Sequence, residues 1–566
     1  MTDVLTLPLW VAFVVAAVAA ATLPRRPGHA LAVALTLVTV PWAFALPAGT
    51  VLSVAPLGFE QVLLRVDGLT RPVAALFGFV AAANVLYGYA TGADGRQTAY
   101  ALCYMGAGVA AVVAGDWLTL LVAWELLAVA STVLVWHHGG EAVRVAFRYA
   151  VYHLLGGAFL VAGVALQFTA TGTFLYGDGF TPGLPTALAL VGVSVNLGVV
   201  GLHAWLSETY PVPHVAASVV LAGFTTKVAV YVLARVVPDG SVVVAWLGAV
   251  MILYGVTQAV LQTDLRRLLS YHIVSQVGYM VVAVGIGTAA GLTGAFAHLT
   301  AHVLYKGLLF MVAGAIVIRT GEESLKRLGG LARRMPLTFA TFLVAALAIA
   351  GFPGFSGFVS KGLVTKAVES AGTGVALGPL GGDLLWWALV AGSVGTVLSF
   401  AKFGYYAFVR AAPARVPVAR APRTLSVSLV VVAVPCVLFG VFPTAFLGLF
   451  AGDPGSFEPY AASELTKALA ATAVGVVGFV VLRGPIARLP AVDVDRVLHP
   501  AAARVATATA ASFVRVGDAA SARGAALSAH LGSLAGRDER VDTSLHAALW
   551  ALALTTALAL LAAALA

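Results

Sequence analysis

Apolar segments of about 20 residues recur along almost the whole chain, separated by short polar stretches. A helix of this length crosses a hydrocarbon core of about 30 Å, and few residues within the segments are charged. The pattern predicts an all-α polytopic membrane protein with about 16 spans. The expected spans are 6–23, 29–47, 69–91, 98–115, 117–136, 145–171, 186–206, 214–236, 243–262, 267–288, 292–318, 337–371, 384–409, 426–450, 463–482 and 545–565.

Two stretches interrupt this pattern. The first reads AWLSETYPVPH at 204–214, where Pro211 and Pro213 end any continuous helix. The second reads GFPGFSGF at 351–358, inside an otherwise apolar run. Irregular backbone at membrane depth is tolerated only where protein or a wet cavity surrounds it, and interrupted helices in both halves of a chain indicate a transport site built on an internal repeat. An ordinary loop explains 204–214 equally well, whereas the functional interpretation is favoured for 351–358.

Basic residues gather in alternate loops. Cytoplasmic loops collect lysine and arginine, so the alternation supports an even number of spans with both termini outside. The basic loops hold Arg25 and Arg26, Arg96, Arg144, Arg266 and Arg267, Arg319–Arg334, Arg410–Arg423, and Arg483 and Arg488.

Composition agrees with a membrane protein. Of 566 residues, 60% are hydrophobic and 10% are charged, whereas soluble domains carry about 25% charged residues. Soluble enzymes and nucleic-acid binders are therefore excluded despite a net charge of +9. Cys103 and Cys436 are too far apart in sequence to indicate a disulfide framework or a metal site, and no phosphate-binding loop occurs, so no cofactor or metal is expected.

The region 483–544 differs from the rest. It is polar and alanine-rich, with arginines spaced among apolar residues, which predicts an amphipathic helix lying along the cytoplasmic face. A mobile linker before the last span is the alternative.

Ionisable residues inside the expected spans are costly, and they usually mark ion or proton paths. Glu125 lies centrally in its span, and Lys227 lies deep in another. His298, His302 and Lys306 recur every four residues, which places them on one helix face with about 6 Å of rise between neighbours. These groups, with water between them, could relay protons.

Lysine at these depths is informative because the loops carry mostly arginine. A buried lysine can give up its proton near neutral pH, and arginine cannot. Lys361, directly after the second interruption, belongs to the same set. For Glu125 and the three lysines the alternative is a structural ion pair. His203 and His272 are more simply interpreted as core histidines, with an accessory role as the alternative.

Several motifs together resemble a known family. They are WELLAVAS, GLHAWLSETYPVPH, TTKVAVYVLAR, DLRRLLSYHIVSQVGYM, AHVLYKGLLFMVAGA and GFPGFSGFVSK, within residues 60–410. The chain resembles the antiporter-like membrane subunits of Mrp-type Na⁺/H⁺ antiporters and of respiratory complex I. The sequences of the motifs SYHIVSQVGYM and TTKVAVYVLAR are most similar to those of the D-type subunits of the Mrp antiporters.

The resemblance implies a 14-helix core containing two inverted five-helix repeats, each with a broken helix. The C-terminal amphipathic helix and extra spans resemble those of the longer members. The expected organisation is 1–97 for N-terminal spans, 98–262 and 263–410 for the two repeat regions, 411–482 for C-terminal spans, 483–544 for the amphipathic segment and 545–566 for the last span.

The resemblance also implies residue roles. Glu125 matches the fifth-helix glutamate of the family, and Lys227 the eighth-helix lysine. His298, His302 and Lys306 match the eleventh-helix relay, and Lys361 the twelfth-helix lysine. One position departs from the pattern: the broken seventh helix usually carries a lysine 31 residues before the eighth-helix lysine, and here that residue is Asn196. Glu125 therefore lacks its usual cationic partner, which puts a proton path through the first half in question.

Three functions fit the sequence. The leading one is a proton-conducting subunit of a multisubunit Na⁺/H⁺ antiporter in a prokaryotic plasma membrane, with other subunits as partners. The second is a pumping subunit of a redox-driven complex, such as complex I or a membrane-bound hydrogenase, with its electron-transfer centres in partner subunits because this chain has no cysteine cluster. The third is a scaffold subunit with a disabled channel.

Overall fold

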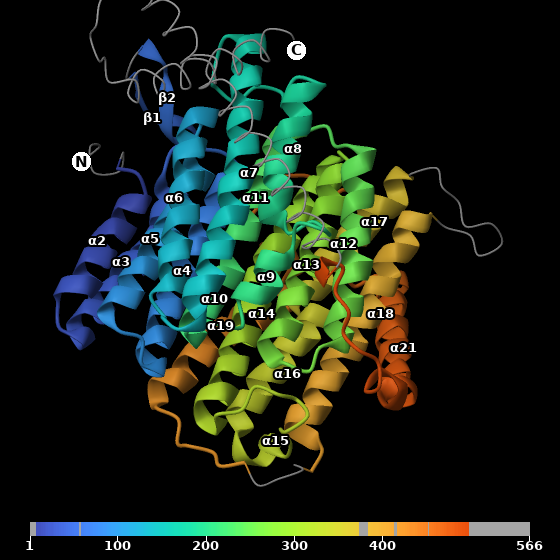
Figure 1. Ribbon diagram of the computed structural model, residues 1–566. Coiled ribbons are helices and arrows are strands. Elements are labelled where there is room, and N and C mark those ends of the chain that lie inside the picture. The colour runs from blue at the N-terminus through green and yellow to red at the C-terminus, as the bar shows by residue number, and fades with distance from the viewer. Residues whose placement is uncertain (1–6, 56–57, 373–382, 412–415, 451, 497–566) are drawn as a thin grey trace, which may run out of the picture. The chain divides into compact units, whose positions relative to one another are not determined.

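The computed structural model describes residues 7–55, 58–372, 383–411, 416–450 and 452–496. The chain divides into two compact units, Met1–Ala491 and Val492–Ala566, and all helices and strands named here lie in the first. This unit is almost entirely helical (Figure 1).

The helices follow the apolar segments closely. The first group is α2 (Trp10–Thr22), α3 (Arg25–Ala45), α4 (Thr70–Thr91), α5 (Gly95–Val113), α6 (Trp117–Trp136) and α7 (Glu141–Thr171). The second is α8 (Leu184–Leu197), α9 (Ala204–Thr209), α10 (Val215–Gly223), α11 (Thr225–Val236), α12 (Val242–Leu261), α13 (Leu265–Gly285) and α14 (Ala289–Thr320). The third is α15 (Leu331–Arg334), α16 (Pro336–Ala350), α17 (Ser356–Ala371), α18 (Leu384–Gly404), a π-helical turn (Tyr405–Val409), α19 (Arg423–Val441), α20 (Pro443–Leu447) and α21 (Ala462–Ile486).

The predicted all-α membrane architecture is confirmed. Every expected span within the described residues coincides with one or two helices, while 545–565 and most of the segment 483–544 lie outside them. Among the described residues, 11 helical segments are long and apolar enough to cross a membrane, and shorter apolar helices occur at α2, α8 and α16. The expected number of about 16 therefore includes spans made of short or paired helices.

Burial divides the helices into an inner and an outer set. All residues of the continuous segment α10–α11 except Arg235, and all residues of α13 except Arg267, are buried inside the protein, and most of α14 is buried too. By contrast, α21 exposes most of its apolar surface, and α6, α12 and α19 expose much of theirs. Such surface is stable in hydrocarbon rather than in water, so these outer faces meet lipid or partner subunits.

Small residues allow the inner helices to approach closely. A Cβ atom added at Gly248 of α12 would lie 2.6 Å from the backbone nitrogen of Val282 in α13, and one at Gly278 would lie 2.6 Å from the carbonyl oxygen of Gly248. Close backbone packing of this kind is how helices associate where hydrophobic burial supplies no driving force.

The break in the second half lies where the sequence predicts it. Helix α16 ends at Ala350 and α17 begins at Ser356, with Gly351 (φ 78°) and Gly354 (φ 92°) in the left-handed region between them. Glycine adopts this conformation without steric cost, which explains why the chain can turn within the span.

The break in the first half begins earlier than the prolines suggest. Helix α8 ends at Leu197, and the turn that follows contains Gly198 (φ 71°) and Gly201 (φ 94°). Pro211 and Pro213 instead separate the short α9 from α10. The broken span is therefore α8–α9, interrupted at 198–203.

A β-hairpin not predicted from the sequence precedes α4. Strand β1 (Gly49–Val54) pairs antiparallel with β2 (Gln61–Val66). Buried Asp116 ties this hairpin to the start of α6, because its Oδ2 accepts a 2.6 Å hydrogen bond from Val62 N while its Oδ1 accepts one from Thr119 N as the helix N-cap.

Candidate functional site

Four lysines are buried in the described residues: three belong to the predicted set and lie on three different helices, and the fourth, Lys402 of α18, donates to Val260 O at 2.6 Å. Lys227 of α11 and Lys306 of α14 are fully buried, and Lys361 of α17 is 5% exposed. A buried ammonium normally pairs with a carboxylate, since desolvation is costly. The structural ion pair considered from the sequence does not occur for these lysines within the described residues. We refer to Lys227, Lys306 and Lys361 as the lysine axis.

Backbone carbonyls take the place of carboxylates. Lys361 Nζ donates to Ile349 O at 2.8 Å, and Lys227 Nζ donates to Ala222 O at 2.5 Å and to Thr226 Oγ1 at 3.0 Å. Ile349 lies at the end of α16, and Ala222 lies at the end of α10, which stops at Gly223 before α11 begins at Thr225. The last turn of a helix has carbonyls without intrahelical partners, so helix interruptions supply uncharged acceptors for two of the three lysines.

The histidines expected to form a relay share one face of α14. The four-residue spacing of His298, His302 and Lys306 lies within a continuous helix, as predicted. The ring centroids of His298 and His302 are 6.4 Å apart. Both rings are fully buried, and neither nitrogen of His302 has a hydrogen-bond partner among the described residues.

His298 links α14 to the helix that carries Lys361. Its Nδ1 lies 3.0 Å from Ser360 Oγ, and its Nε2 lies 3.4 Å from Tyr305 Oη. Ser360 directly precedes Lys361, whose Nζ lies 4.8 Å from the centroid of the Tyr279 ring. His298 and Lys361 are therefore brought together by α14, α17 and α13.

The lysine axis and the two histidines lie close to one another. Lys306 follows His302 by one turn of α14, and Lys361 directly follows Ser360, which contacts His298. Lys306 itself donates to Leu269 O at 3.2 Å. A proton on any one of these groups therefore changes the electrostatic energy of the others.

Glu125 lies apart from this set. It is half-buried on α6, and its carboxylate rests against Gly157 of α7, where a Cβ atom would overlap Oε1. Glu125 forms no hydrogen bond or ion pair with other residues of the described ranges. Asn196, which stands where the family usually has lysine, is fully buried on α8 with both polar side-chain atoms unpartnered among the described residues.

The two accessory histidines are both buried. His203 follows the α8–α9 break, and its Nδ1 accepts a 3.3 Å hydrogen bond from Gly201 N. His272 of α13 lies 4.8 Å from the Phe400 ring, and neither of its nitrogens has a partner within the described residues. His203 thus stabilises a turn, whereas His272 is a core histidine whose hydrogen bonds the surrounding protein does not satisfy.

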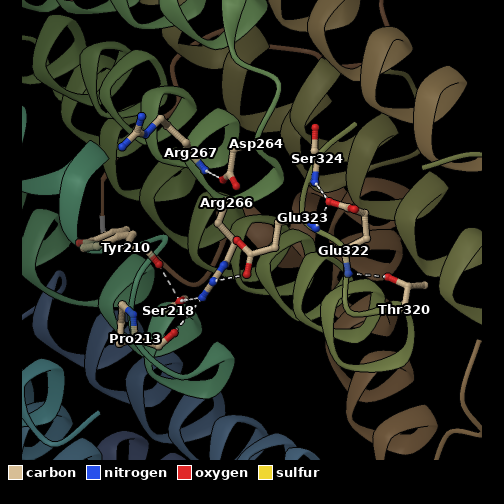
Figure 2. A network of polar contacts seen from close by, with 10 residues as sticks. All are labelled: Tyr210, Pro213, Ser218, Asp264, Arg266, Arg267, Thr320, Glu322, Glu323 and Ser324. Carbon is tan, nitrogen blue, oxygen red and sulfur yellow. Dashed lines mark hydrogen bonds and ion pairs between the residues drawn. The ribbon is translucent and has the colours of Figure 1, made fainter. Parts of the chain in front are cut away.

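A polar network that the sequence did not reveal surrounds Arg266 at the start of α13 (Figure 2). Its guanidinium donates to Pro213 O at 2.8 Å, to Ser218 Oγ at 3.3 Å and to Glu323 Oε1 at 2.6 Å. Arg266 is 5% exposed. It therefore joins the segment after α9, the start of α10 and the loop after α14, and it is more than the cytoplasmic loop charge that the sequence suggested.

The network is extended by local capping. Asp264 accepts from Arg267 N at 2.7 Å as the N-cap of α13, and Ser218 Oγ donates to Tyr210 O at 2.7 Å. Asp264, at the start of DLRRLL, is the sequence signal that could have located the start of the helix, because aspartate is a common N-cap. Once the helix starts there, Arg266 faces the interior and Arg267 faces outward.

Comparison with known proteins identifies the family. A profile described as "NADH:quinone oxidoreductase/Mrp antiporter, TM" matches residues 114–380, which include every candidate residue from Glu125 to Lys361. The N-type subunit of the NADH-quinone oxidoreductase of Desulforudis audaxviator is 31% identical over 433 residues, covering 72% of this chain and 83% of that protein. The chain belongs to this family. The expected antiporter-like resemblance is thereby confirmed.

Other members of the antiporter-like family match shorter regions. The L-type subunit of the NADH-quinone oxidoreductase of Mycobacterium tuberculosis is 35% identical over 293 residues, 48% of this chain and 46% of that protein, so the chain spans about half of that relative's length. The D-type subunit of the Na(+)/H(+) antiporter of Alkalihalophilus pseudofirmus is 31% identical over 330 residues, 54% of this chain and 66% of that protein.

Solved structures share the antiporter-like fold. A chain of the Mrp complex from Dietzia sp. aligns with a TM-score of 0.67 and 24% identity, covering 84% of this chain and 99% of that one. A chain of the membrane-bound sulfane sulfur reductase, an archaeal respiratory membrane complex, aligns with a TM-score of 0.70 and 22% identity, covering 98% and 99%. Both are subunits of membrane complexes.

Proposed function

We propose that this chain is a proton-conducting subunit of a multisubunit cation/proton antiporter, and that protons move through it along the lysine axis and the α14 histidines. The lysine axis carries the proposal: three buried lysines are held by neutral acceptors, with two histidines between them. Buried ionisable groups without a structural ion pair are a cost to the fold, which a transport role explains.

The chemistry follows from the side chains. A neutral lysine accepts a proton at Nζ and becomes an ammonium, which later releases that proton to the next acceptor. Each imidazole can receive a proton at one nitrogen while the other gives one up, so His298 and His302 can pass protons in either direction. Because the charges of the axis repel one another, protonation at one end favours proton release at the other.

A monovalent cation, most directly Na⁺, is the proposed exchange partner. The relatives named as D-type subunits of Na(+)/H(+) antiporters, and the structural likeness to an Mrp complex, support this assignment. The complex would lie in a prokaryotic plasma membrane, with further subunits against the exposed apolar faces.

A redox-driven complex is the second candidate. The alignment with the chain of the sulfane sulfur reductase covers 98% of this chain, compared with 84% for the Mrp chain, and many sequence relatives are quinone oxidoreductase subunits. In that setting the same lysine axis would conduct protons, and electron transfer in partner subunits would supply the energy.

The test uses everted vesicles from an antiporter-deficient host that expresses the whole gene neighbourhood. We expect added Na⁺ to change the transmembrane ΔpH without any electron donor, and Lys227→Ala to abolish this change. The matched control is Lys366→Ala, which removes a partly exposed lysine elsewhere. Proton movement only after an electron donor is added would assign the chain to the redox class. Unchanged transport in an assembled Lys227→Ala complex would overturn the lysine axis as the proton path.

A further inference from the structure

A histidine outside the expected set occupies the first half of the protein close to Glu125 and Asn196. We infer that His153 of α7 is a proton-binding site that supplies the basic group missing at Asn196 and connects Glu125 with the lysine axis. The inference rests on the proposed function, and it assigns to the first half a working proton path instead of a disabled one.

Helix geometry places His153 on α7 between the face that meets α6 and the face that meets α8. Gly157, one turn further along α7, contacts the carboxylate of Glu125 on α6. Gly156 faces α8, where its Cβ atom would lie 3.0 Å from Val195 Cβ, next to Asn196. Residues i and i+4 share a helix face at about 6 Å of rise. His153 therefore lies on the face of α7 between α6 and α8, one turn away from the carboxylate.

Hydrogen bonding leaves one nitrogen of His153 ready to accept a proton. Nδ1 lies 2.9 Å from Tyr149 O, and a carbonyl oxygen only accepts, so Nδ1 carries the hydrogen. Nε2 is then an unprotonated acceptor, and it has no partner among the described residues although the side chain is 1% exposed. A buried lone pair of this kind costs free energy unless it binds a proton or water.

Aromatic packing holds the ring in place without using its nitrogens. The ring stacks on Tyr149 at 3.9 Å between centroids and meets the edge of Trp205 at 4.6 Å. Trp205 Nε1 donates to Val195 O at 2.9 Å, which fixes α9 against α8 beside Asn196. The ring is therefore oriented by its neighbours, while Nε2 stays available.

Hydroxyl groups lead from this ring toward Lys227. Tyr149 Oη lies 3.4 Å from Thr225 Oγ1, and Thr225 Oγ1 lies 2.7 Å from Tyr104 Oη. Thr226, the next residue, accepts from Lys227 Nζ at 3.0 Å. The polar groups thus run from α7 to α11, at the first lysine of the axis.

The charged groups on the surrounding elements are consistent with this role. On α6 the charge is Glu125; on α11 the charges are Lys227 and Arg235, and Arg235 already pairs with Asp67. Glu208 of α9 already pairs with Arg148 of α7 at 2.9 Å, more than two turns of helix away from Gly157. Glu125 is therefore the carboxylate that can give a proton to His153: the carboxyl O–H breaks, an N–H forms at Nε2 directly or through a water, and the resulting imidazolium and carboxylate attract each other.

The experiment measures transport by the assembled complex in everted vesicles, with assembly checked for every variant. His153→Phe keeps an aromatic ring for Tyr149 and Trp205, and His153→Gln keeps polarity without binding a proton. We expect transport by both to fall to about a tenth of the wild-type rate or below, because a relay needs every member. His138→Phe, which removes an exposed histidine between α6 and α7, should transport normally.

A rescue separates proton binding from packing. In the double variant His153→Phe with Asn196→Lys, a lysine returns where the family usually has one, and transport should recover at least several-fold over His153→Phe. Normal transport by His153→Phe and His153→Gln, while Lys227→Ala is inactive, would overturn the assignment and leave the proposed function standing. An assembled but unrescued double variant would also overturn it, because His153 would then act by packing alone. Active Lys227→Ala would reject the proposed function instead.

Discussion

Lys361 Nζ donates a 2.8 Å hydrogen bond to Ile349 O across the break between α16 and α17. The lysine belongs to the second half of the broken span, and its acceptor belongs to the first. The same interruption that leaves a carbonyl without an intrahelical partner therefore provides the acceptor for Lys361. Under the proposed function, a change in the conformation of the break would change the protonation of Lys361.

Replacement of Lys361 should separate charge from proton exchange. Lys361→Ala removes the titrating group, and Lys361→Arg keeps a positive charge that cannot be given up. We expect both variants to abolish transport in everted vesicles, with Lys366→Ala on the same helix as the active control. Transport by Lys361→Arg at the wild-type rate would show that a fixed charge is sufficient at this position.

A methyl group at Gly157 should affect function more than stability. Its Cβ atom would overlap Glu125 Oε1, the far end of a flexible side chain, so the carboxylate moves while the backbone stays in place. We expect Gly157→Ala to change the free energy of unfolding by less than about 1 kcal/mol and to slow transport clearly. Gly484→Ala of α21, where the added atom meets open space, is the control. Equal transport rates for the two variants would show that the position of the Glu125 carboxylate does not matter.

Loss of Arg266 should destabilise the protein. Arg266→Met leaves Pro213 O and Glu323 without their donor. Removing one member of a buried ion pair costs about 3–5 kcal/mol, and the partly exposed Glu323 side chain places this pair at or below the low end of that range. The midpoint of thermal or denaturant unfolding in detergent measures this. Arg267→Met, on the exposed side of the same helix turn, should stay within about 0.5 kcal/mol of wild type. Similar midpoints for both variants would contradict a structural role for the network of Figure 2.

Stability should fall in acid partly because of Asp67, which lies outside the membrane-spanning helices. Burial works to raise the pKa of its carboxyl, but the ion pair with Arg235 and hydrogen bonds from Thr70 outweigh burial and hold the pKa below its ordinary value of 3.8. A carboxyl with a lowered folded-state pKa stabilises the fold fully above its unfolded pKa, and this contribution is lost as the pH falls through the folded pKa.

Unfolding midpoints between pH 7 and pH 3 test this contribution. We expect Asp67→Asn to be less stable than wild type at pH 7 and to lose less stability below about pH 4. Asp178→Asn, which replaces an exposed carboxylate, should follow the wild-type curve. Parallel curves for wild type and Asp67→Asn would show that this ion pair does not contribute to acid sensitivity.

Most of the architecture could be predicted because the bilayer imposes a simple pattern on the sequence. Apolar runs of the right length became helices, and the Pro/Gly cluster at 351–358 became a break. The sequence predicts the first break at 204–214, and the structure has it at 198–203. The prediction follows the prolines, which can be seen in a sequence, whereas the positive φ of Gly198 and Gly201 cannot. The β-hairpin at 49–66 was missed because its short strands pair with an irregular register.

The polar interior was predicted only in part. The spacing of His298, His302 and Lys306 is sufficient to predict that they share one helix face, because one helix carries all three. His153 could not be distinguished from a packed aromatic residue, since only the fold shows which of its nitrogens is occupied and that Glu125 lies one turn away. Arg266 and Arg267 are adjacent and chemically identical, and only the start of α13 at Leu265 decides which one turns inward.

The carbonyl partners of the lysine axis determine what happens when a proton leaves. If each lysine were paired with a carboxylate, loss of the lysine proton would leave an unpaired anion in the low-dielectric interior, where it is poorly solvated. The attraction lost in that step would make release of the proton unfavourable. A carbonyl oxygen carries no formal charge, so it can accept a hydrogen bond from the lysine both as an ammonium and as a neutral amine. Under the proposed function, the interior of the protein would therefore hold a variable number of positive charges, and partner subunits would set that number by shifting the surrounding electric field.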